Sequence, residues 1–509
     1  MAQSLTMLLA ILSGALVVHQ LIKRTQQGSR GGEEEDDRVT RKKKRLNLME
    51  FENASCSNLG ELEAKDKKTT DWQQLGLEQP LVIAMVGLPA RGKSFISKMI
   101  IRYLKWTGFE CEVFNVGSHR RHVGLQSADA SFFGNGNESL REEMAMSVQD
   151  DMYVWLHGVK RRVAIFDATN TTKKRRVALA KRARAENTYL LFVESICDDQ
   201  QVLRRNYQLK LQNDDYKDMD PVAAFADFSA RVEQYEKRYE TIEDSEDDGQ
   251  ISYIQLINVG QKVITRNCSG YLPSQISFYL QNVHIGERKI YLCLNAESVY
   301  CATPTGTDGT SAGVVEGDRL AGTFEAGELS EAGRIFGMDL AKFIQERQEG
   351  VSSRSQGKEM LVLTGTSREQ AESVSHLRIL YTVYCTQLLN ELRGGDLHGL
   401  SKAQIKERYP IEFEKRNRDK LNYRYPGAGE SYRDVIERIR PIIIELERQR
   451  KSVLVVCHMA VLRCISSYFL NTDLADIPFK NFKRHHVYEL TVGAFGTTIK
   501  EFPLPEFFL

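Results

Sequence analysis

A glycine-rich loop that ends in a lysine and a serine is the part of this sequence that points most directly to chemistry. Residues 87–94 match the pattern G-x-x-x-x-G-K-[ST] in full. In such a loop the backbone N–H groups turn inward around phosphate oxygens, the lysine reaches the β- and γ-phosphates, and the hydroxyl ligates Mg²⁺. The sequence therefore predicts a nucleoside triphosphate site. Its predicted residues are Gly87, Leu88, Pro89, Ala90, Arg91, Gly92, Lys93 and Ser94.

An acidic residue follows a second apolar run, where a partner of the phosphate loop is expected. Asp167 comes directly after residues 163–166 and is followed by Ala168-Thr169-Asn170. A carboxylate there holds magnesium through water, orients the attacking hydroxyl, or does both. The alternative is an aspartate that caps a helix before a threonine-rich turn. We predict Ser94 and Asp167 as the residues that face the metal.

Basic residues recur near the ends of the predicted strands of the same region. Arginine forks match phosphate geometry, so such a group suits a second, phosphorylated substrate. Taken singly, each is equally typical of a solvated surface charge. The residues concerned are Arg120, Arg121, Lys173, Lys174, Arg175, Arg176, Arg141, Lys210 and Arg231.

The elements that must position these residues alternate between strand and helix. Residues 81–86 form a continuous apolar run, as expected for a parallel strand buried on both faces, and a helix is predicted over 94–103. Further strands are predicted at 111–116, 163–166, 189–193 and 251–259, with a surface loop at 243–250 and a closing helix at 270–282. The pattern predicts an open parallel α/β sheet.

A second α/β unit is predicted to begin at residue 288. Its strands are expected at 288–292, 360–364 and 452–456. Apolar residues at helical spacing predict a long helix over 431–450, and Pro441 inside it predicts a kink or a break.

Composition bounds the remaining possibilities. The chain has 509 residues, which favours two folded domains plus extensions, and a net charge of +1, which gives no overall basic field for nucleic acid. The nine cysteines are scattered without a C-x-x-C pair, which fits a reducing compartment.

The N-terminus differs from the rest of the chain. Residues 5–22 are mostly apolar and are followed by Lys23 and Arg24, so they are either a membrane anchor, with the domains facing the cytosol, or a buried or fraying amphipathic arm. Dense charge over 28–78 predicts a disordered linker. The predicted organisation is an anchor at 1–27, this linker, and folded domains at 79–285 and 286–500.

Several ordered blocks carry a family resemblance. GLPARGKS, FNVG before Arg-Arg, FDATNTT, VESIC, DKLNYRYP, GESY and VVCHMAVLRC, spread over about residues 80–495, resemble the 6-phosphofructo-2-kinase/fructose-2,6-bisphosphatase family. The resemblance implies a P-loop-type kinase domain followed by a histidine-phosphatase-like, phosphoglycerate-mutase-like α/β domain. It implies a cytoplasmic homodimer whose kinase transfers the γ-phosphate of ATP, with Mg²⁺, to the 2-hydroxyl of fructose 6-phosphate. The product, fructose 2,6-bisphosphate, regulates glycolysis and gluconeogenesis.

The resemblance also assigns kinase roles position by position. Asp167, Lys93 and Cys197 match active-site residues, and Asn206 lies in a segment that contacts ATP. The positions that match fructose 6-phosphate ligands are Arg120 or Arg121, Arg141, Thr169, Arg175, Lys210, Arg231 and Tyr235.

The second half departs from the family pattern. A histidine phosphatase needs Arg-His-Gly-Glu after its first strand, because the histidine attacks phosphorus and the arginine clamps the phosphate. Here Leu294 and Asn295 stand in place of the arginine and the nucleophile, and Glu297 follows. Arg368-Glu369 replaces the expected Lys-Arg, Met459 replaces a glutamine beside the retained His458, and His398 lies in the proton-donor region. We predict that bisphosphatase activity is lost.

Two other functions are alternatives to a kinase that makes fructose 2,6-bisphosphate and does not hydrolyse it. The chain could be a regulatory pseudoenzyme or scaffold, although the intact phosphate loop and Asp167 argue against that. It could also be a kinase for another sugar phosphate, which a comparison of acceptors would reveal.

Overall fold

The computed structural model describes most of the two predicted domains. The described residues are 79–123, 132, 135–157, 162–211, 215–216, 219–258, 260–283, 286, 288–298, 327–349, 360–493 and 496–504. The predicted anchor at 1–27 and linker at 28–78 lie outside them. Within these ranges, none of the helices is long and apolar enough to cross a membrane.

The first sheet has six strands in the order β2-β3-β1-β4-β5-β6. Neighbouring strands are parallel except for β5 and the edge strand β6, which run antiparallel. The strands are β1 (Leu81–Val86), β2 (Glu110–Asn115), β3 (Arg162–Asp167), β4 (Tyr189–Ile196), β5 (Tyr253–Ile257) and β6 (Lys262–Arg266). The prediction of an open parallel sheet is confirmed for β1 to β5, whereas the antiparallel edge strand β6 was not foreseen.

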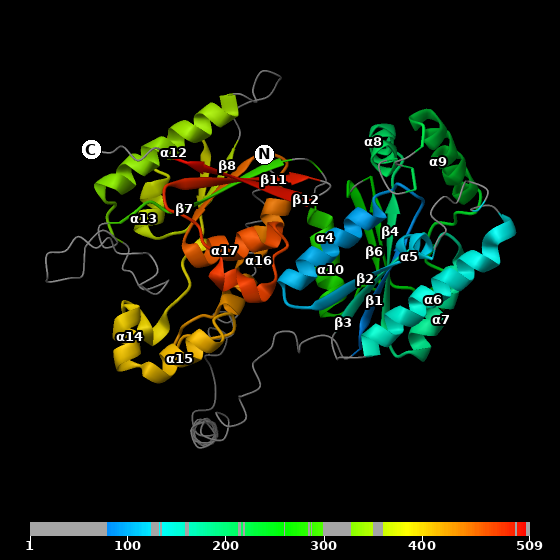
Figure 1. The fold of residues 1–509 in the computed structure, drawn as a ribbon, viewed down its shortest axis with the longest axis horizontal. Coiled ribbons are helices and arrows are strands. Elements are labelled where there is room, and N and C mark those ends of the chain that lie inside the picture. Colours follow the sequence, from blue (N-terminus) through cyan, green and yellow to red (C-terminus); the bar gives the residue numbers. More distant parts are fainter. Residues whose placement is uncertain are drawn as a thin grey trace, which may run out of the picture. The chain divides into compact units, whose positions relative to one another are not determined.

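Helices cover both faces of this sheet (Figure 1). Alternate residues of β1 belong to separate cores: Leu81, Ile83 and Met85 join one, and Val82, Ala84 and Val86 join the other. Burial on both faces is why the strand reads as an unbroken apolar run. The helices are α4 (Lys93–Trp106), α5 (Val116–His122), α6 (Glu138–His157), α7 (Lys173–Ala185), α8 (Gln200–Lys210), α9 (Pro221–Glu236) and α10 (Tyr271–Asn282).

The second sheet also has six strands, in the order β12-β11-β7-β10-β8-β9. Strands β7, β10, β8 and β9 are parallel, and β11 and β12 add an antiparallel edge. The strands are β7 (Arg288–Leu294), β8 (Leu361–Thr364), β9 (Thr382–Cys385), β10 (Val453–Cys457), β11 (His486–Gly493) and β12 (Gly496–Pro503). The helices are α12 (Glu331–Glu349), α13 (Arg368–Ser373), α14 (Lys402–Arg408), α15 (Pro410–Arg418), α16 (Tyr432–Arg448) and α17 (Met459–Phe469).

Two local predictions hold only in part. Helix α16 runs without a break through Pro441, whose side chain is exposed on the outer face of the helix. The segment 243–250 is more than a surface loop, because it contains a 3₁₀ turn, Glu246–Gly249, and the Glu246 side chain is only 1% exposed. A buried glutamate was not foreseen because its ion-pair partner lies seventy residues earlier in the chain.

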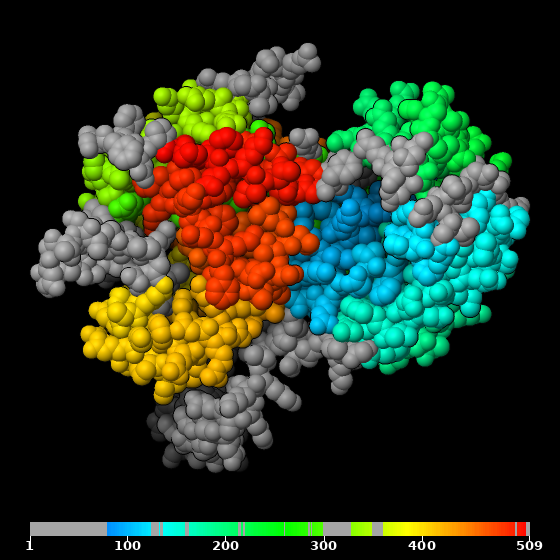
Figure 2. Space-filling view, in the orientation of Figure 1, coloured from blue at the N-terminus to red at the C-terminus, as the bar shows by residue number. Residues whose placement is uncertain are grey.

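One continuous apolar core joins helices from both halves of the chain. The Trp106 indole N–H, at the end of α4, donates to the carbonyl of Cys464 in α17 at 3.0 Å. Arg102 of α4 pairs with the buried carboxylate of Glu447 in α16, which also accepts from the Tyr468 hydroxyl at 2.6 Å. In the space-filling view the surfaces of α4 (blue) and of α16 and α17 (orange) abut (Figure 2).

Candidate active site

A cavity of about 1090 Å³ lies at the carboxyl edge of the first sheet. The loops that follow β1, β2, β3 and β4 all contribute to it, as expected when parallel strands end at one edge. It brings together nearly all of the predicted kinase residues. Those that line it are Pro89, Ala90, Arg91, Gly92, Lys93, Ser94, Arg120, Arg121, Arg141, Asp167, Thr169, Arg175, Cys197, Asn206, Lys210, Arg231 and Tyr235.

The two remaining loop residues, Gly87 and Leu88, do not line the cavity but shape the loop that does. Gly87 has a φ of +134°, and a Cβ atom there would lie 2.5 Å from the Ser195 carbonyl oxygen, so only glycine fits. Its N–H donates to the carbonyl of Thr169 at 2.9 Å, which ties the loop to the turn after β3. Gly92, with a φ of +89°, turns the chain into α4.

Lys93 points back into the loop. Its Nζ donates to the carbonyls of Gly87 at 2.8 Å and Leu88 at 2.6 Å. Burial lowers the pKa of Lys93 to about 7, with Asp167 opposing the shift and Lys210 adding to it. An anion bound in the loop would reverse this shift, because a negative charge favours the protonated amine.

Asp167 ends β3 and is buried. Its Oδ2 accepts from the side-chain amide of Asn115 at 2.6 Å, and these two residues are register partners at the ends of β2 and β3. Sequence reasoning missed Asn115, although its place at the end of a predicted strand was a usable signal. The amide fixes one carboxylate oxygen.

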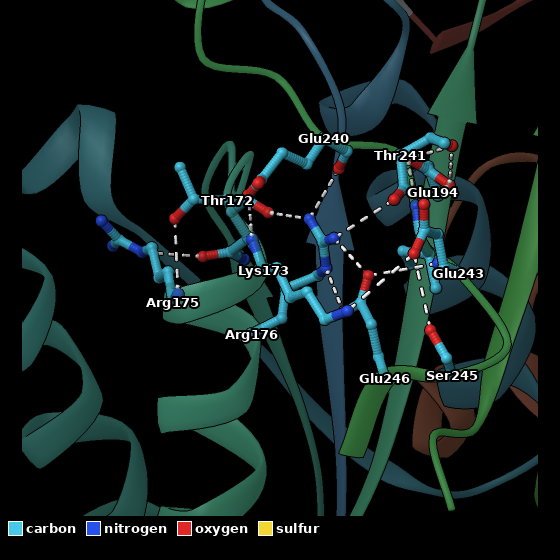
Figure 3. A network of polar contacts seen from close by, with 12 residues as sticks. Thr172, Lys173, Arg175, Arg176, Glu194, Glu240, Thr241, Glu243, Ser245 and Glu246 are labelled. Carbon is cyan, nitrogen blue, oxygen red and sulfur yellow. Dashed lines mark hydrogen bonds and ion pairs between the residues drawn. The ribbon is translucent and has the colours of Figure 1, made fainter. Parts of the chain in front are cut away.

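The turn after β3 is held by a polar network (Figure 3). Arg176 and Glu246 form a buried ion pair, with Nε–Oε2 at 2.9 Å and Nη2–Oε1 at 2.5 Å. Arg176 also donates to the carbonyls of Asn170 at 3.2 Å and Glu240 at 2.9 Å. The pair therefore anchors the turn that carries Thr169 into the cavity.

Asn170 completes this anchoring. Its side-chain amide donates to the carbonyl of Met85 at 2.8 Å, and its Oδ1 accepts from Nε of Arg175 at 3.1 Å. Arg175 also pairs with Glu142 at 3.1 Å. The predicted substrate residue Arg175 is thus oriented from two sides.

Three of the predicted substrate arginines converge on one carboxylate. Nη2 of Arg120 lies 2.8 and 2.7 Å from the two oxygens of Asp215, while Arg121 and Arg231 approach it at 3.6 and 3.7 Å. Sequence reasoning missed Asp215, because no motif or strand end marks it.

Burial shifts the pKa values of three other predicted residues. Burial lowers the pKa values of Lys210 and Arg141, and it raises the pKa of the Cys197 thiol. Asn206 donates to the carbonyl of Ala90 at 3.0 Å, which holds α8 against the phosphate loop.

The corresponding edge of the second sheet has a different chemistry. Leu294 and Asn295 are both buried where β7 ends, and the Asn295 amide donates to the carbonyl of Ala296 at 3.1 Å. His458 precedes α17, and its Nε2 lies 3.1 Å from Glu369, while Nδ1 lies 3.7 Å from Glu391. The imidazole is flanked by two carboxylates.

Glu297 and His398 lie apart from that pair of contacts. The imidazole of His485 lies 3.9 Å from the Glu297 carboxylate and lowers its pKa. His398 is exposed on the surface. Within the described residues, neither side chain forms a hydrogen bond or ion pair with Asn295, which stands at the position predicted for the nucleophile.

The first sheet and its cavity define a P-loop phosphotransferase, and comparisons with known proteins agree. Residues 68–287 match the 6-phosphofructo-2-kinase family, and residues 365–503 match the histidine phosphatase superfamily, branch 1. The protein 6-phosphofructo-2-kinase/fructose-2,6-bisphosphatase 3 of Rattus norvegicus is 36% identical over 425 residues, which cover 83% of this chain and 71% of that protein.

A probable 6-phosphofructo-2-kinase of Schizosaccharomyces pombe is 35% identical over 483 residues, covering 84% of this chain and 70% of its own length. Among solved structures, a mycobacterial glucosyl-3-phosphoglycerate phosphatase is 20% identical, with a TM-score of 0.32, and the match covers 42% of this chain and 97% of that one. The chain belongs to the 6-phosphofructo-2-kinase/fructose-2,6-bisphosphatase family.

Proposed function

We propose that the chain transfers the γ-phosphate of ATP to the 2-hydroxyl of fructose 6-phosphate and does not hydrolyse the product. The observation that carries the proposal is one cavity that is lined by the phosphate loop, by Asp167 and by the arginines Arg120, Arg121, Arg175 and Arg231. A phosphoryl transfer needs groups that bind the triphosphate, a metal ion and groups that position the acceptor, and the cavity has candidate residues for each of these roles.

In this proposal the phosphate loop holds the triphosphate. Lys93 leaves its two carbonyl partners and turns to the β- and γ-phosphates, where the anion restores its positive charge. The loop amides and the N-terminus of α4 bind the remaining phosphate oxygens.

The residues present suit Mg²⁺. The Ser94 hydroxyl and the Asp167 carboxylate both line the cavity and are hard oxygen donors. Among the described residues no group of three or more His, Cys, Asp or Glu could hold a metal, which fits an ion that takes most of its ligands from phosphate and water. When bound, such an ion neutralises charge on the transferring phosphoryl group.

The acceptor is positioned by charge and by hydrogen bonds. Arg121, Arg231 and Arg175 are proposed to bind the 6-phosphate and sugar, with Thr169 and Tyr235 beside them in the cavity. Asp167, with one oxygen fixed by an amide, is proposed to orient the 2-hydroxyl. Most of the acceleration would come from positioning, not from a strong general base.

The chemistry of the second site supports the proposed loss of the phosphatase reaction. An amide nitrogen lacks a lone pair basic enough to attack phosphorus, so Asn295 cannot form a phosphoenzyme. Leu294 offers no positive charge, and Glu369 places a carboxylate against His458 where a phosphate would need cations.

The proposal is tested by one pair of assays on the purified chain. Incubation with ATP, Mg²⁺ and fructose 6-phosphate should yield fructose 2,6-bisphosphate, and other sugar phosphates at equal concentration should react more slowly. Lys93→Met should abolish the reaction, whereas Lys105→Met, an exposed lysine on the same helix, should retain it. Labelled fructose 2,6-bisphosphate should remain intact on incubation; its release of the 2-phosphate would refute the second half of the proposal.

The organisation of the chain belongs to the same proposal. We place the kinase domain at 79–285 and the phosphatase-like domain at 286–500, in a homodimer tethered to a membrane by residues 5–22. Vesicle co-sedimentation of the full chain and of a chain lacking residues 1–27 tests the tether, because only the full chain should sediment.

A further inference from the structure

The carboxylate of Asp215 is buried in the wall of the kinase cavity, and exposure increases outward through the arginines around it. The side chains of Asp215 and Arg120 are 6% and 5% exposed, against 17% for Arg231 and 28% for Arg121. All four residues line the cavity. Asp215 and Arg120 are therefore shielded from water. Arg121 and Arg231 are more exposed, and they face the space where a substrate would lie.

The distances to Asp215 distinguish Arg120, which is hydrogen-bonded to it, from Arg121 and Arg231, which lie farther away. One nitrogen of Arg120 contacts both carboxylate oxygens at hydrogen-bond distance, 2.8 and 2.7 Å. Arg121 and Arg231 approach one of those oxygens, Oδ2, at 3.6 and 3.7 Å, which are ion-pair distances beyond a normal hydrogen bond. The short contacts fix the carboxylate, and its charge attracts the outer guanidinium groups.

Arginines crowded into one partly buried wall repel one another unless an anion lies between them. Asp215 supplies that anion before any substrate arrives. Two guanidinium groups held toward a common point then need less reorganisation to bind a phosphate, which is the benefit of a preorganised site.

We infer that Asp215 is a positioning residue for the phosphate subsite of the acceptor, with Arg120 as its anchor and Arg121 and Arg231 as the groups it orients. The inference rests on the proposed function, since the phosphate concerned is that of the sugar substrate. Asp215 acts through the arginines and does not itself touch the sugar phosphate.

The experiment compares three variants of the full chain. Asp215→Asn keeps the shape and removes the charge, and Asp215→Glu keeps the charge. Asp150→Asn is the matched control, because Asp150 pairs with Arg182 away from the cavity. Asp215→Asn should raise KM for fructose 6-phosphate by about 10- to 100-fold, the loss that supporting residues of a site commonly cause.

In the same variant, kcat and KM for ATP should stay within about threefold of the parent values, because the nucleotide grip is unchanged. Asp215→Glu should recover most of the lost affinity, and Asp150→Asn should match the parent chain. A general structural role would instead change KM for both substrates together and lower the melting temperature.

Calorimetric titration with fructose 6-phosphate tests the proposed function and the role of Asp215 separately, because it measures binding and does not depend on turnover. If the parent chain binds no sugar phosphate, the proposed function fails. If the parent chain binds it and Asp215→Asn binds it equally well, the role of Asp215 is refuted while the function stands.

Discussion

Glu447 offers the sharpest test of how the two halves of the chain depend on each other. Its side chain is 0% exposed, and its carboxylate accepts from Arg102 of α4, Arg288 of β7 and the Tyr468 hydroxyl of α17. Burial alone would lower the pKa of Arg102, but Tyr468 and Glu447 outweigh it and raise that pKa. The proposed perturbation is Glu447→Gln, which keeps the shape and removes the charge.

The expected cost follows from burial and from the number of partners. Removing one member of a buried, hydrogen-bonded ion pair costs about 3–5 kcal/mol, because the remaining charge has no counter-ion. A neutral hydrogen bond would cost only about 1 kcal/mol. Two arginines lose their shared partner here, so we expect at least about 3 kcal/mol, a large part of the 5–15 kcal/mol that stabilises a typical protein.

Urea unfolding followed by tryptophan fluorescence measures this loss, since Trp106 lies at the joined faces of the two domains. Glu445→Gln is the matched control on the same helix: its partner, Arg448, is half exposed, so the expected loss is below about 1 kcal/mol.

Helix α4 begins at Lys93, so release of Arg102 should also raise KM for ATP. A stability within about 1 kcal/mol of the parent chain would refute the claim that this carboxylate joins the domains.

Three further predictions concern the kinase cavity. Gly87→Ala should destabilise the chain by about 1–3 kcal/mol in urea and weaken ATP binding, whereas Gly136→Ala, which meets open space, should be neutral. Glu246→Gln should cost about 3–5 kcal/mol and raise KM for the sugar phosphate. Asp247→Asn, whose partner Arg184 is half exposed, should cost less than about 1 kcal/mol. Because the pKa of free Lys93 is about 7 and a bound anion raises it, ATP binding should take up a proton. Calorimetry should show the affinity falling by up to about tenfold per pH unit above pH 7; a flat profile would contradict the assignment.

Local signals carried most of what could be predicted from the sequence. The strand at 81–86 and the phosphate loop behind it are contiguous in the chain, so pattern and spacing suffice to find them. Asp167 was found for the same reason, because it ends an apolar run. The bounds of the predicted strands shift by a few residues at most, since burial defines their centres better than their ends.

Long-range partners explain what was missed. Asp215 and Arg120 are 95 residues apart in the sequence, and Glu447 and Arg102 are 345 residues apart. The residues next to each acid in the sequence therefore give no indication of its partner. Singly, each reads as a solvated surface charge, which is the usual fate of an acidic residue. Only the fold shows that these two are buried and paired.

The second domain departs from the histidine phosphatase pattern at the end of β7 and beside His458. Leu294 is buried, Asn295 donates to a neighbouring carbonyl, and Glu369 contacts His458. In the proposed function these residues account for the loss of the phosphatase reaction, while the core around them stays packed.

The second domain also contacts the kinase helix α4. Trp106 donates to the backbone of α17, and the buried carboxylate of Glu447 pairs with Arg102. Because α4 carries Lys93 at its first turn and these contacts nearer its end, the phosphatase-like domain supports the helix that presents the phosphate loop. The second domain thereby stabilises, through packing, the helix on which the kinase site depends.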